Sequence, residues 1–299
     1  MTDSSSQRVG LVGVGIMGSA IATRLLQCGH ALTLYDRNDH KIQAMVDKGA
    51  TSAASPGEVA AASDFVILSL NNAAGVESVV FGEQGVIRGA APEKLLIDMS
   101  SIDPGATRSL AERLMQESGM PWLDAPLSGG APGALSGKLT VMAGGSSEAF
   151  EKSRQVMDDL CGNFTLMGPQ GAGQTTKLVN QVLCAVSFQA IAEATQLALN
   201  GGVEVERIPA ALAGGRADSR LLQEFMAKMG RHDYSPTGRL DNMLKDLEAV
   251  QAFAAQTRTA MPVTSLTTEI HRLFVAAGNG TDDNAALMKQ FNGPRDETD

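Results

Sequence analysis

The residues best suited to chemistry lie in a glycine-rich turn and the stretch after it, Gly171-Ala-Gly-Gln-Thr-Thr-Lys177-Leu-Val-Asn180-Gln181. Between residues 174 and 199 only two side chains are charged, and one of them is Lys177. Apolar residues recur there without leaving a wide polar face, so this stretch predicts one long helix that is buried on most sides. Because Asn180 and Gln181 follow Lys177 by three and four residues, the three side chains share a face. We interpret Lys177 as a proton donor in a cleft; the alternative is a lysine that extends to solvent from the first turn.

A second glycine-rich turn, Gly13-Val14-Gly15-Ile16-Met17-Gly18, follows an apolar run with β-branched residues and precedes an amphipathic stretch. Strand, glycine turn and helix in this order indicate a dinucleotide site. Gly13 allows a tight turn, Gly15 lets a pyrophosphate approach the backbone, and Gly18 lets the helix pack on the strand. Ile16 and Met17 lie at the start of the helix, whose N-terminus faces the phosphates.

The choice of nucleotide depends on the next expected strand, residues 31–35, which ends at Asp36. This acid lies 18 residues beyond Gly18, where a carboxylate hydrogen-bonds the adenosine ribose. Asp36 disfavours a 2′-phosphate by its charge, whereas Arg37 can pair with one. The sequence therefore predicts NAD and leaves NADP open.

Strand and helix patterns alternate through the first half of the chain, which predicts a doubly wound, Rossmann-type α/β domain over residues 1–169. Further strands are expected at 65–70, 95–98, 122–125, 139–143 and 163–167. Ser55-Pro56-Gly57-Glu58 and Asp103-Pro104 are helix starts, with an N-cap and a proline in the first turn. Gly29 is the kind of residue that ends a helix.

The second half shows only helical patterns, which predicts an all-helical C-terminal domain over residues 170–299, joined to the first by the long interdomain helix. Helices are expected at 208–212, 219–229, 240–255 and 262–277. The polar residues 293–299 are expected to be disordered. Lys245 and Asp246 are adjacent within a helix, so their side chains should not face each other, and a solvated helix face is the default explanation.

The loops after the expected strands carry polar and small residues. Leu70, Asn71 and Ser101 lie at the carboxyl ends of strands of a parallel sheet, so they should line the cofactor crevice; the alternative for Asn71 and Ser101 is that they cap their own turns. The stretch Ser128-Gly129-Gly130 also follows a strand on the cofactor side. Its backbone N–H groups can form an anion-binding nest, and the alternative is a plain loop.

Composition excludes several classes of function. The net charge of −9 without a basic cluster argues against nucleic acid or an anionic membrane as a partner. The longest apolar run of the central helix, residues 182–186, is too short to span a bilayer, and residues 1–7 lack an apolar signal core. We therefore expect a cytoplasmic protein. The three cysteines and four histidines follow no metal-ligand spacing, so no metal site is predicted.

Taken together, these motifs resemble those of the β-hydroxyacid dehydrogenase family, which includes 3-hydroxyisobutyrate dehydrogenases, tartronate semialdehyde (2-hydroxy-3-oxopropionate) reductases and threonate dehydrogenases. The resemblance covers residues 9–291. Its most specific part is the Gly171-to-Gln181 stretch together with Asp124-Ala-Pro-Leu-Ser128-Gly129-Gly130 upstream.

The resemblance implies a role for each matching residue. It makes Lys177 the catalytic residue, and Ser128, Gly129 and Gly130 the binding site of the substrate carboxylate, with help from Asn180. The positions that match nucleotide contacts of the family are Leu70, Asn71, Ser101 and Gly75, and Lys245 would reach the cofactor or the closed cleft.

The expected reaction is NAD(P)-dependent interconversion of a short 3-hydroxy acid and its semialdehyde, with Lys177 as general acid or base. Gln181, in place of a second asparagine, resembles the semialdehyde reductases. A threonate- or sulfolactaldehyde-type dehydrogenase, an imine reductase and a non-catalytic nucleotide sensor are the alternatives. For an imine reductase, a carboxylate or tyrosine would be expected near the lysine position. The apolar central helix predicts a homodimer or homotetramer.

Overall fold

The computed structural model describes residues 6–235 and 237–291, and the chain divides into two compact units, residues 1–177 and 178–299. The division falls within the long helix α8 (Ala172–Asn200), directly after Lys177. The boundary expected from the sequence, at residues 169 and 170, lies at the turn before this helix. The expected disorder of residues 293–299 falls outside the described residues.

Nine strands form one sheet in the described part of unit 1, residues 1–177. They are β1 (Arg8–Val12), β2 (Ala31–Tyr35), β3 (Thr51–Ser52), β4 (Phe65–Leu68), β5 (Leu95–Asp98), β6 (Trp122–Asp124), β7 (Leu127–Ser128), β8 (Leu139–Gly144) and β9 (Cys161–Gly168). Their order is β3-β2-β1-β4-β5-β6-β8-β7, with β9 paired to β8. The strands from β3 to β6 are parallel, and β8 runs antiparallel to β6 and β7. This confirms the doubly wound sheet, in which the carboxyl ends of the neighbours β1 and β4 border the nucleotide crevice.

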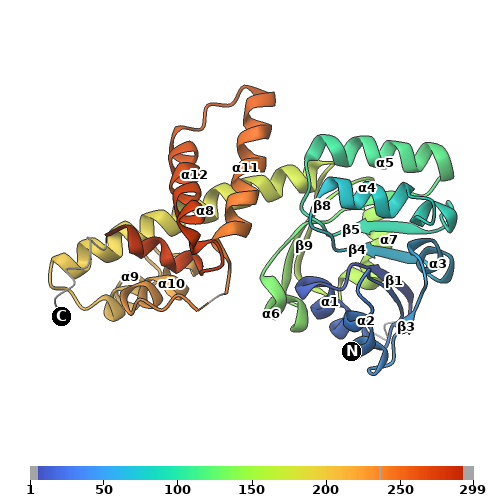
Figure 1. Ribbon diagram of the computed structural model, residues 1–299, viewed down its shortest axis with the longest axis horizontal. Helices are drawn as coiled ribbons and strands as arrows, with labels where there is room; N and C mark the ends of the chain where they lie inside the picture. Colours follow the sequence, from blue (N-terminus) through green and yellow to red (C-terminus); the bar gives the residue numbers. More distant parts are fainter. Residues whose placement is uncertain (1–5, 236, 292–299) are drawn as a thin grey trace. The chain divides into compact units, whose positions relative to one another are not determined.

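Helices cover both faces of this sheet (Figure 1). One face carries α1 (Ile16–Gln27), α2 (Asp39–Val46), α6 (Gly130–Leu135) and α7 (Ser147–Met157), and the other carries α3 (Pro56–Ala62), α4 (Ala73–Phe81) and α5 (Pro104–Ser118). Alternate residues along each strand reach opposite cores: Ile67 of β4 packs with α1, whereas Val66 packs with α4. The sheet is therefore buried on both sides, as expected of parallel strands.

The helix ends in unit 1 follow the capping residues of the sequence. Ser55 accepts a hydrogen bond from Glu58 N at 3.2 Å, and the Glu58 carboxylate accepts one from Ala54 N at 2.8 Å. Asp103 caps α5 through Ala106 N at 2.8 Å. Gly29, after the end of α1, has a φ of +87°, which favours glycine. These helix boundaries were confirmed because each depends on short-range hydrogen bonds.

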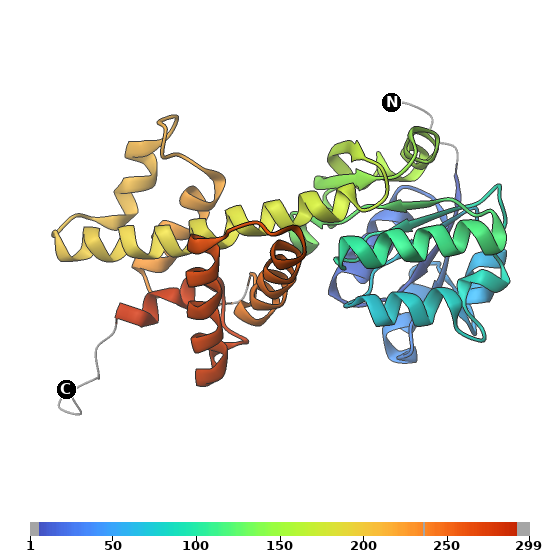
Figure 2. The same ribbon diagram turned by 90° about the horizontal axis from the view of Figure 1, so that it is seen from above.

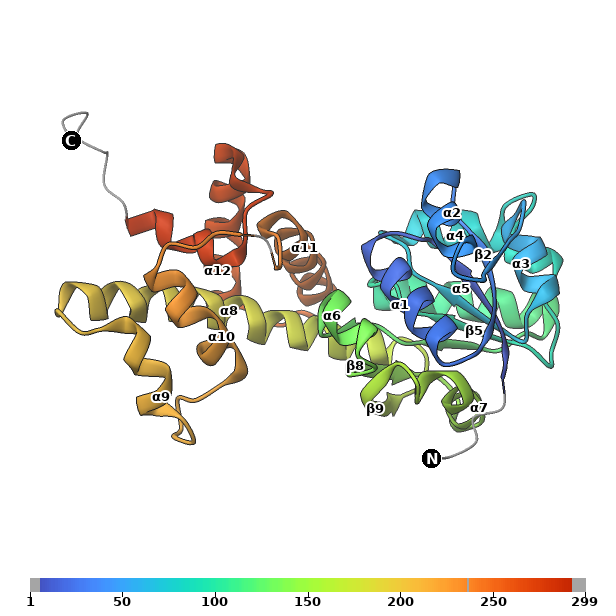
Figure 3. The ribbon, with the colours of Figure 1, turned by 90° about the horizontal axis from the view of Figure 1, so that it is seen from below.

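The described part of unit 2, residues 178–299, is helical. It contains most of α8, then α9 (Ile208–Leu212), α10 (Arg220–Gly230), α11 (Leu240–Thr257) and α12 (Pro262–Phe274). Short 3-10 segments lie at Val205–Arg207 and Asn284–Phe291, and a π-helical turn at Val275–Asn279 ends the last long helix earlier than expected. Figure 2 shows α11 and α12 side by side. Phe188 of α8 and Phe225 of α10 meet at 4.6 Å between ring centroids, within the apolar core of this unit. Figure 3 shows the two helices that carry these residues, seen from below.

Helix α8 is more exposed than the sequence predicts. Val179, Leu183 and Leu197 are exposed by 54%, 64% and 74%, so the expectation that the helix is buried on most sides is wrong for this chain. The cause is that α8 packs along one side only, where Phe188 and Ile191 enter the core of unit 2. By length and mean hydropathy alone α8 could cross a membrane. This is weak evidence of a span, because the core helix of a globular domain passes the same test.

Candidate active site

The glycine turn after β1 has the shape that a dinucleotide needs. Gly13 has a φ of +98°, and a Cβ there would lie 2.3 Å from the Ser69 carbonyl oxygen. A Cβ on Gly18 would lie 1.9 Å from the Gly13 carbonyl oxygen, so only glycine allows α1 to pack this closely. A Cβ on Gly15, by contrast, would meet open space. The residues present therefore fit a phosphate at Gly15, before the N-terminus of α1.

Ile16 and Met17 form the first turn of α1, where Ile16 is exposed and Met17 packs against the core. No side chain among the described residues caps this helix. Its free N–H groups are therefore available to a phosphate.

Asp36 directly follows β2 and contacts the same turn. Its Oδ2 accepts a hydrogen bond from Val14 N at 2.7 Å, and its Oδ1 accepts one from Asn38 N at 2.9 Å. Because each carboxylate oxygen has two lone pairs, Asp36 can hold the turn and still accept from ribose hydroxyls. Arg37 is exposed beside it.

The strand-end loops meet at the carboxyl edge of β4 and β5. Leu70 N donates to Ser100 Oγ at 3.0 Å, which connects the two loops. Asn71 is exposed, and Ser101 is half-buried. Gly75 lies in the first turn of α4, where its N–H donates to the Asn72 side chain at 2.8 Å. The cofactor contacts expected of these residues stay predictions.

The Ser128-Gly129-Gly130 stretch has more regular structure than a plain loop. Ser128 belongs to β7 and pairs with Thr140 of β8, and Gly130 begins the short helix α6. Gly129 and Gly130 have φ angles of +117° and +60°, which few other residues adopt. Ser128 is half-buried and both glycines are exposed.

The first turn of α8 packs directly on β6 and β8. A Cβ on Gly173 would lie 2.4 Å from the Met142 carbonyl oxygen and 2.7 Å from Asp124 Oδ2. Gly171, with a φ of +85°, begins the turn. Asp124 accepts from Gly171 N at 2.8 Å and from Gln174 N at 3.0 Å. Burial raises the pKa of Asp124 to about 6, against the lowering effect of these hydrogen bonds.

Gln174 connects this turn to the loop after β5. Its Oε1 accepts from Ile102 N at 3.2 Å, and its Nε2 donates to the Ser100 carbonyl oxygen at 2.8 Å. Ser100 N in turn donates to Asp98 Oδ1 at 3.0 Å. Burial raises the pKa of Asp98 to about 7. The sequence reading did not single out Gln174 or Asp98 for a role.

Lys177 is half-buried, three residues beyond Gln174 on α8. Further along this helix, Asn180 Nδ2 donates to Gln181 Oε1 at 2.7 Å. Gln181 Nε2 donates to Asp246 Oδ2 at 2.6 Å within unit 2.

Lys245 corrects one expectation. Its Nζ lies 3.3 Å from Asp246 Oδ1, although the two residues are adjacent. The long, half-exposed lysine side chain bends back to its neighbour, so the argument that adjacent residues on a helix do not pair is wrong here. Lys245 as a cofactor contact stays a prediction.

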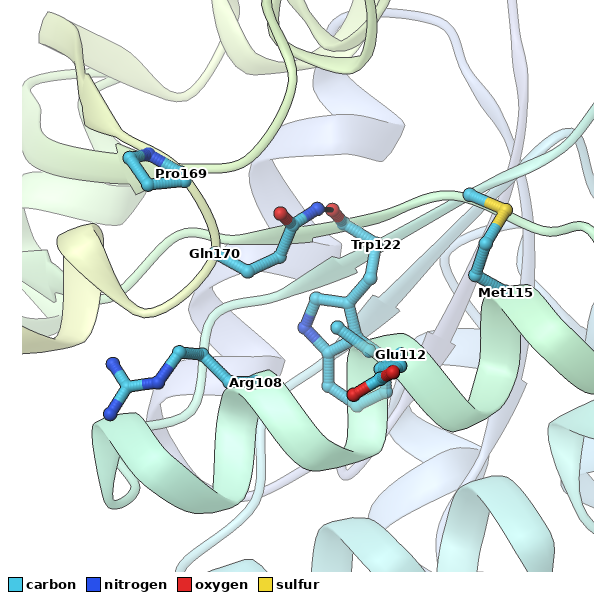
Figure 4. Close-up of a pocket in the computed structure, with 7 residues that line it drawn as sticks. Arg108, Glu112, Met115, Trp122, Pro169 and Gln170 are labelled. Atoms are coloured by element: carbon cyan, nitrogen blue, oxygen red, sulfur yellow. Dashed lines mark hydrogen bonds between the residues drawn. The ribbon is translucent and has the colours of Figure 1, made fainter.

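A separate pocket of about 340 Å³ lies between α5 and the residues just before α8 (Figure 4). Trp122, Met115 and Pro169 form part of its lining, and Gln170 Nε2 donates to the Trp122 carbonyl oxygen at 3.3 Å. None of the residues predicted to bind cofactor or substrate lines this pocket.

The sheet topology and the glycine turn define a nucleotide-binding protein, and comparison with known proteins identifies its kind. Residues 8–168 match the family model described as the NAD binding domain of 6-phosphogluconate dehydrogenase. Residues 171–291 match the model described as NAD-binding of NADP-dependent 3-hydroxyisobutyrate dehydrogenase. The protein is therefore an NAD(P)-dependent oxidoreductase.

Curated relatives and solved structures agree over nearly the whole chain. The chain is 36% identical to a probable 3-hydroxyisobutyrate dehydrogenase-like protein of Arabidopsis thaliana, covering 94% of this chain and 92% of that one. It is 33% identical to 2-hydroxy-3-oxopropionate reductase of Escherichia coli, covering 94% and 96%. The 3-hydroxyisobutyrate dehydrogenase of Mycobacterium tuberculosis, solved with L-serine, superposes with a TM-score of 0.88 at 26% identity, covering 97% and 100%. The chain belongs to the β-hydroxyacid dehydrogenase family.

Proposed function

We propose that this protein interconverts a short 3-hydroxy acid and its semialdehyde, with Lys177 as general acid in reduction and general base in oxidation. The observation that carries the proposal is the anchoring of the first turn of α8, which directly precedes Lys177 on the helix. Asp124 and Gln174 fix this turn to β6 and to the loop after β5, on the nucleotide side of the sheet. A proton donor needs such a fixed position, because it must come within about 3 Å of the reacting oxygen.

The glycine turn, Asp36 and the strand-end loops would hold the nucleotide. When bound, the nucleotide would supply the hydride in reduction and accept it in oxidation. In reduction, Lys177 Nζ donates a proton to the carbonyl oxygen as negative charge develops there. The Ser128 hydroxyl and the N–H groups of Gly129 and Gly130 would bind the substrate carboxylate, with Asn180 orienting it.

NAD is the proposed physiological nucleotide. Asp36 directly follows β2, and its Oδ2 accepts from Val14 N of the glycine turn while its Oδ1 accepts from Asn38 N. Its negative charge at this place disfavours a 2′-phosphate. Arg37 is exposed and would support some use of NADP. Lys245 would contribute to nucleotide binding.

The proposed substrates are tartronate semialdehyde and methylmalonate semialdehyde. Gln181, as in semialdehyde reductases, supports this class. Threonate- and sulfolactaldehyde-type substrates are the second choice, because each is a short chain that combines an anionic group with a hydroxyl or aldehyde group.

The test is oxidation of NADH and of NADPH by the purified protein with a panel of short semialdehydes. Lys177→Ala should lower turnover by about 10²- to 10⁴-fold, while NADH binding, measured by fluorescence, stays nearly unchanged. Lys48→Ala, which replaces an exposed lysine of unit 1, is the control and should behave as wild type. Near-normal turnover in Lys177→Ala would contradict the assignment. NADH binding by the wild type without turnover of any panel member would favour the nucleotide sensor.

We also propose a homo-oligomer in which a second copy covers apolar residues of unit 2. Val263, Leu266 and Leu273 are exposed on α12, and their spacing places them on one face of the helix. Exposed leucines at such regular spacing are typical of an interface between subunits. Leu266→Lys should shift the protein toward the monomer in sedimentation velocity. A wild-type protein that sediments as a monomer would contradict the proposal.

A further inference from the structure

The Gln174 side chain holds the backbone on both sides of Ser101. It is 1% exposed, and its amide group forms one hydrogen bond to the residue before Ser101 and one to the residue after it. Nε2 donates to the Ser100 carbonyl oxygen, and Oε1 accepts from Ile102 N. Both bonds run between α8 and the loop after β5, more than 70 residues apart in sequence. Ser101 is thereby held by a residue of α8 that lies three positions before Lys177.

The Gln174 main chain is fixed at the same time. Its N–H donates to Asp124 Oδ2 at 3.0 Å, and Gly171 N donates to the other oxygen of the same carboxylate. Asp124 is fully buried in β6, which lies between β5 and β8 in the sheet. A carboxylate at the N-terminus of a helix also interacts favourably with the helix dipole. The first turn of α8 therefore has little freedom to shift along the sheet.

The loop after β5 is held from its other side by β4 and β5. Ser100 N donates to Asp98 Oδ1, and Ser100 Oγ accepts from Leu70 N. A chain of hydrogen bonds thus runs from the loop after β4, through Ser100 and Gln174, to Asp124. It joins the backbone expected to contact the nucleotide with the first turn of α8, directly before Lys177.

We propose that Gln174 is a positioning residue that keeps Ser101 and Lys177 in one fixed arrangement. The loop that binds the nucleotide and the helix that carries the proton donor then keep the same relative position. The inference rests on the proposed function of Lys177. Gln174 itself touches neither nucleotide nor substrate in this proposal. Its loss would leave the Ser100 carbonyl and the Ile102 N–H buried without a partner, and both segments would relax.

The first test is Gln174→Met, which keeps the length of the side chain and removes both hydrogen bonds. We expect kcat to fall by about 10- to 100-fold, because small displacements of a catalytic group are costly. The matched control is Gln170→Met, which replaces a partly buried glutamine just before α8 whose amide donates to the Trp122 carbonyl oxygen and not to the loop after β5. This control should keep wild-type kcat.

Hydrogen exchange separates positioning from a merely structural effect. In the wild type, saturating NADH should slow amide exchange at residues 171–176, because the loop and the turn are joined through Gln174. In Gln174→Met, saturated with NADH to the same degree, this protection should be lost while protection of the glycine turn at residues 13–18 persists. A melting temperature taken under the same conditions shows that the variant is folded.

Gln174→Glu gives a second readout that depends on pH. A protonated carboxyl can donate to the Ser100 carbonyl and accept from Ile102 N, as the amide does, whereas the ionised form cannot donate. Burial raises the pKa of such a carboxyl, and ionised Asp98 and Asp124 nearby raise it further. The positive charge of Lys177, one turn along the same helix, acts in the opposite direction. We expect activity relative to wild type to be near normal at low pH and to fall as the pH rises.

Two results would overturn the inference. One is wild-type kcat and wild-type NADH-induced protection of residues 171–176 in Gln174→Met; the other is a constant ratio of Gln174→Glu to wild-type activity at every pH. Lys177→Ala, measured in parallel, distinguishes the two proposals. If Lys177→Ala is inactive and Gln174→Met is normal, only the positioning role fails, whereas an active Lys177→Ala removes the proposed function itself.

Discussion

Asp98 should make unit 1 less stable as the pH rises from about 4 to about 7. Its side chain is fully buried, Oδ1 accepts from Ser100 N, and Oδ2 has no hydrogen-bond partner among the described residues. Burial raises the pKa from 3.8 to about 7. Between about pH 4 and pH 7 the folded chain keeps a proton that the unfolded chain has released, so the free energy of unfolding falls with rising pH.

The magnitude follows from the same values. Each unit of pKa difference is worth about 1.4 kcal/mol, so ionised Asp98 costs the folded state about 4 kcal/mol above pH 7. From pH 5 to pH 8, Asp98 should account for a loss of about 3 kcal/mol, and Asp124, whose pKa is also raised, for about 1 kcal/mol. Asp98→Asn removes the first contribution. Its amide N–H₂ lacks a partner and costs about 1 to 3 kcal/mol, so the variant should have a shallower pH dependence and equal or greater stability at pH 8.

The assay is urea unfolding at pH 5 and pH 8, followed by tryptophan fluorescence. Trp122 is the only tryptophan of the chain, is buried in β6 and pairs with Leu96 of β5, so its emission reports on unit 1. Asp64→Asn is the control: the hydrogen bond from Arg8 lowers the pKa of Asp64, so its contribution changes only below about pH 4. That variant should keep the wild-type difference between pH 5 and pH 8. The reasoning is refuted if Asp98→Asn loses as much stability as the wild type over this interval.

Three further substitutions test the glycine turns and the choice of nucleotide. Gly173→Ala places a Cβ 2.4 Å from the Met142 carbonyl oxygen and should destabilise unit 1 by about 1 to 3 kcal/mol in the same urea assay, with a matching loss of kcat. Gly15→Ala meets open space, so the melting temperature should not change, but NADH affinity in a fluorescence titration should fall because the methyl group lies where a phosphate approaches. Asp36→Asn removes a negative charge beside Arg37 and should move the ratio of kcat/KM for NADPH over NADH upward by about 10-fold; an unchanged ratio would show that Asp36 does not read the 2′ position.

Elements with local signals were predicted correctly. The capped helices α3 and α5 and the strand, turn and helix around Gly13 depend on residues close together in sequence, and the structure confirms them. The short elements were missed. β3 and β7 have two residues each, and α6 has six residues rich in glycine and proline, so none shows a periodic pattern. The burial of α8 was overestimated because an apolar composition does not show which side is covered.

The candidate site was predicted in part. Motifs named Lys177 and the glycine turns because these need particular residue types at fixed spacing. The residues that position Lys177 and the turn before it could not be predicted from motifs, because their hydrogen bonds join distant parts of the sequence. Gln174 bonds loop atoms more than 70 residues earlier, and Asp124 bonds Gly171 from 47 residues away. The role of Asp124 could have been predicted from one feature of the sequence. It is a charged residue in an otherwise apolar strand, and a buried charge needs partners.

The structure explains why the stretch before Lys177 is so specific. Gly171 adopts a positive φ, and Gly173 leaves no room for a side chain beside Asp124. Gln174 uses its main chain on β6 and its side chain on the loop after β5. Each of these three constraints acts on the position of the turn within unit 1. The requirement for Gly-x-Gly-Gln before the lysine therefore follows from packing the turn onto the sheet, and it would hold for any substrate that needs a proton at this place.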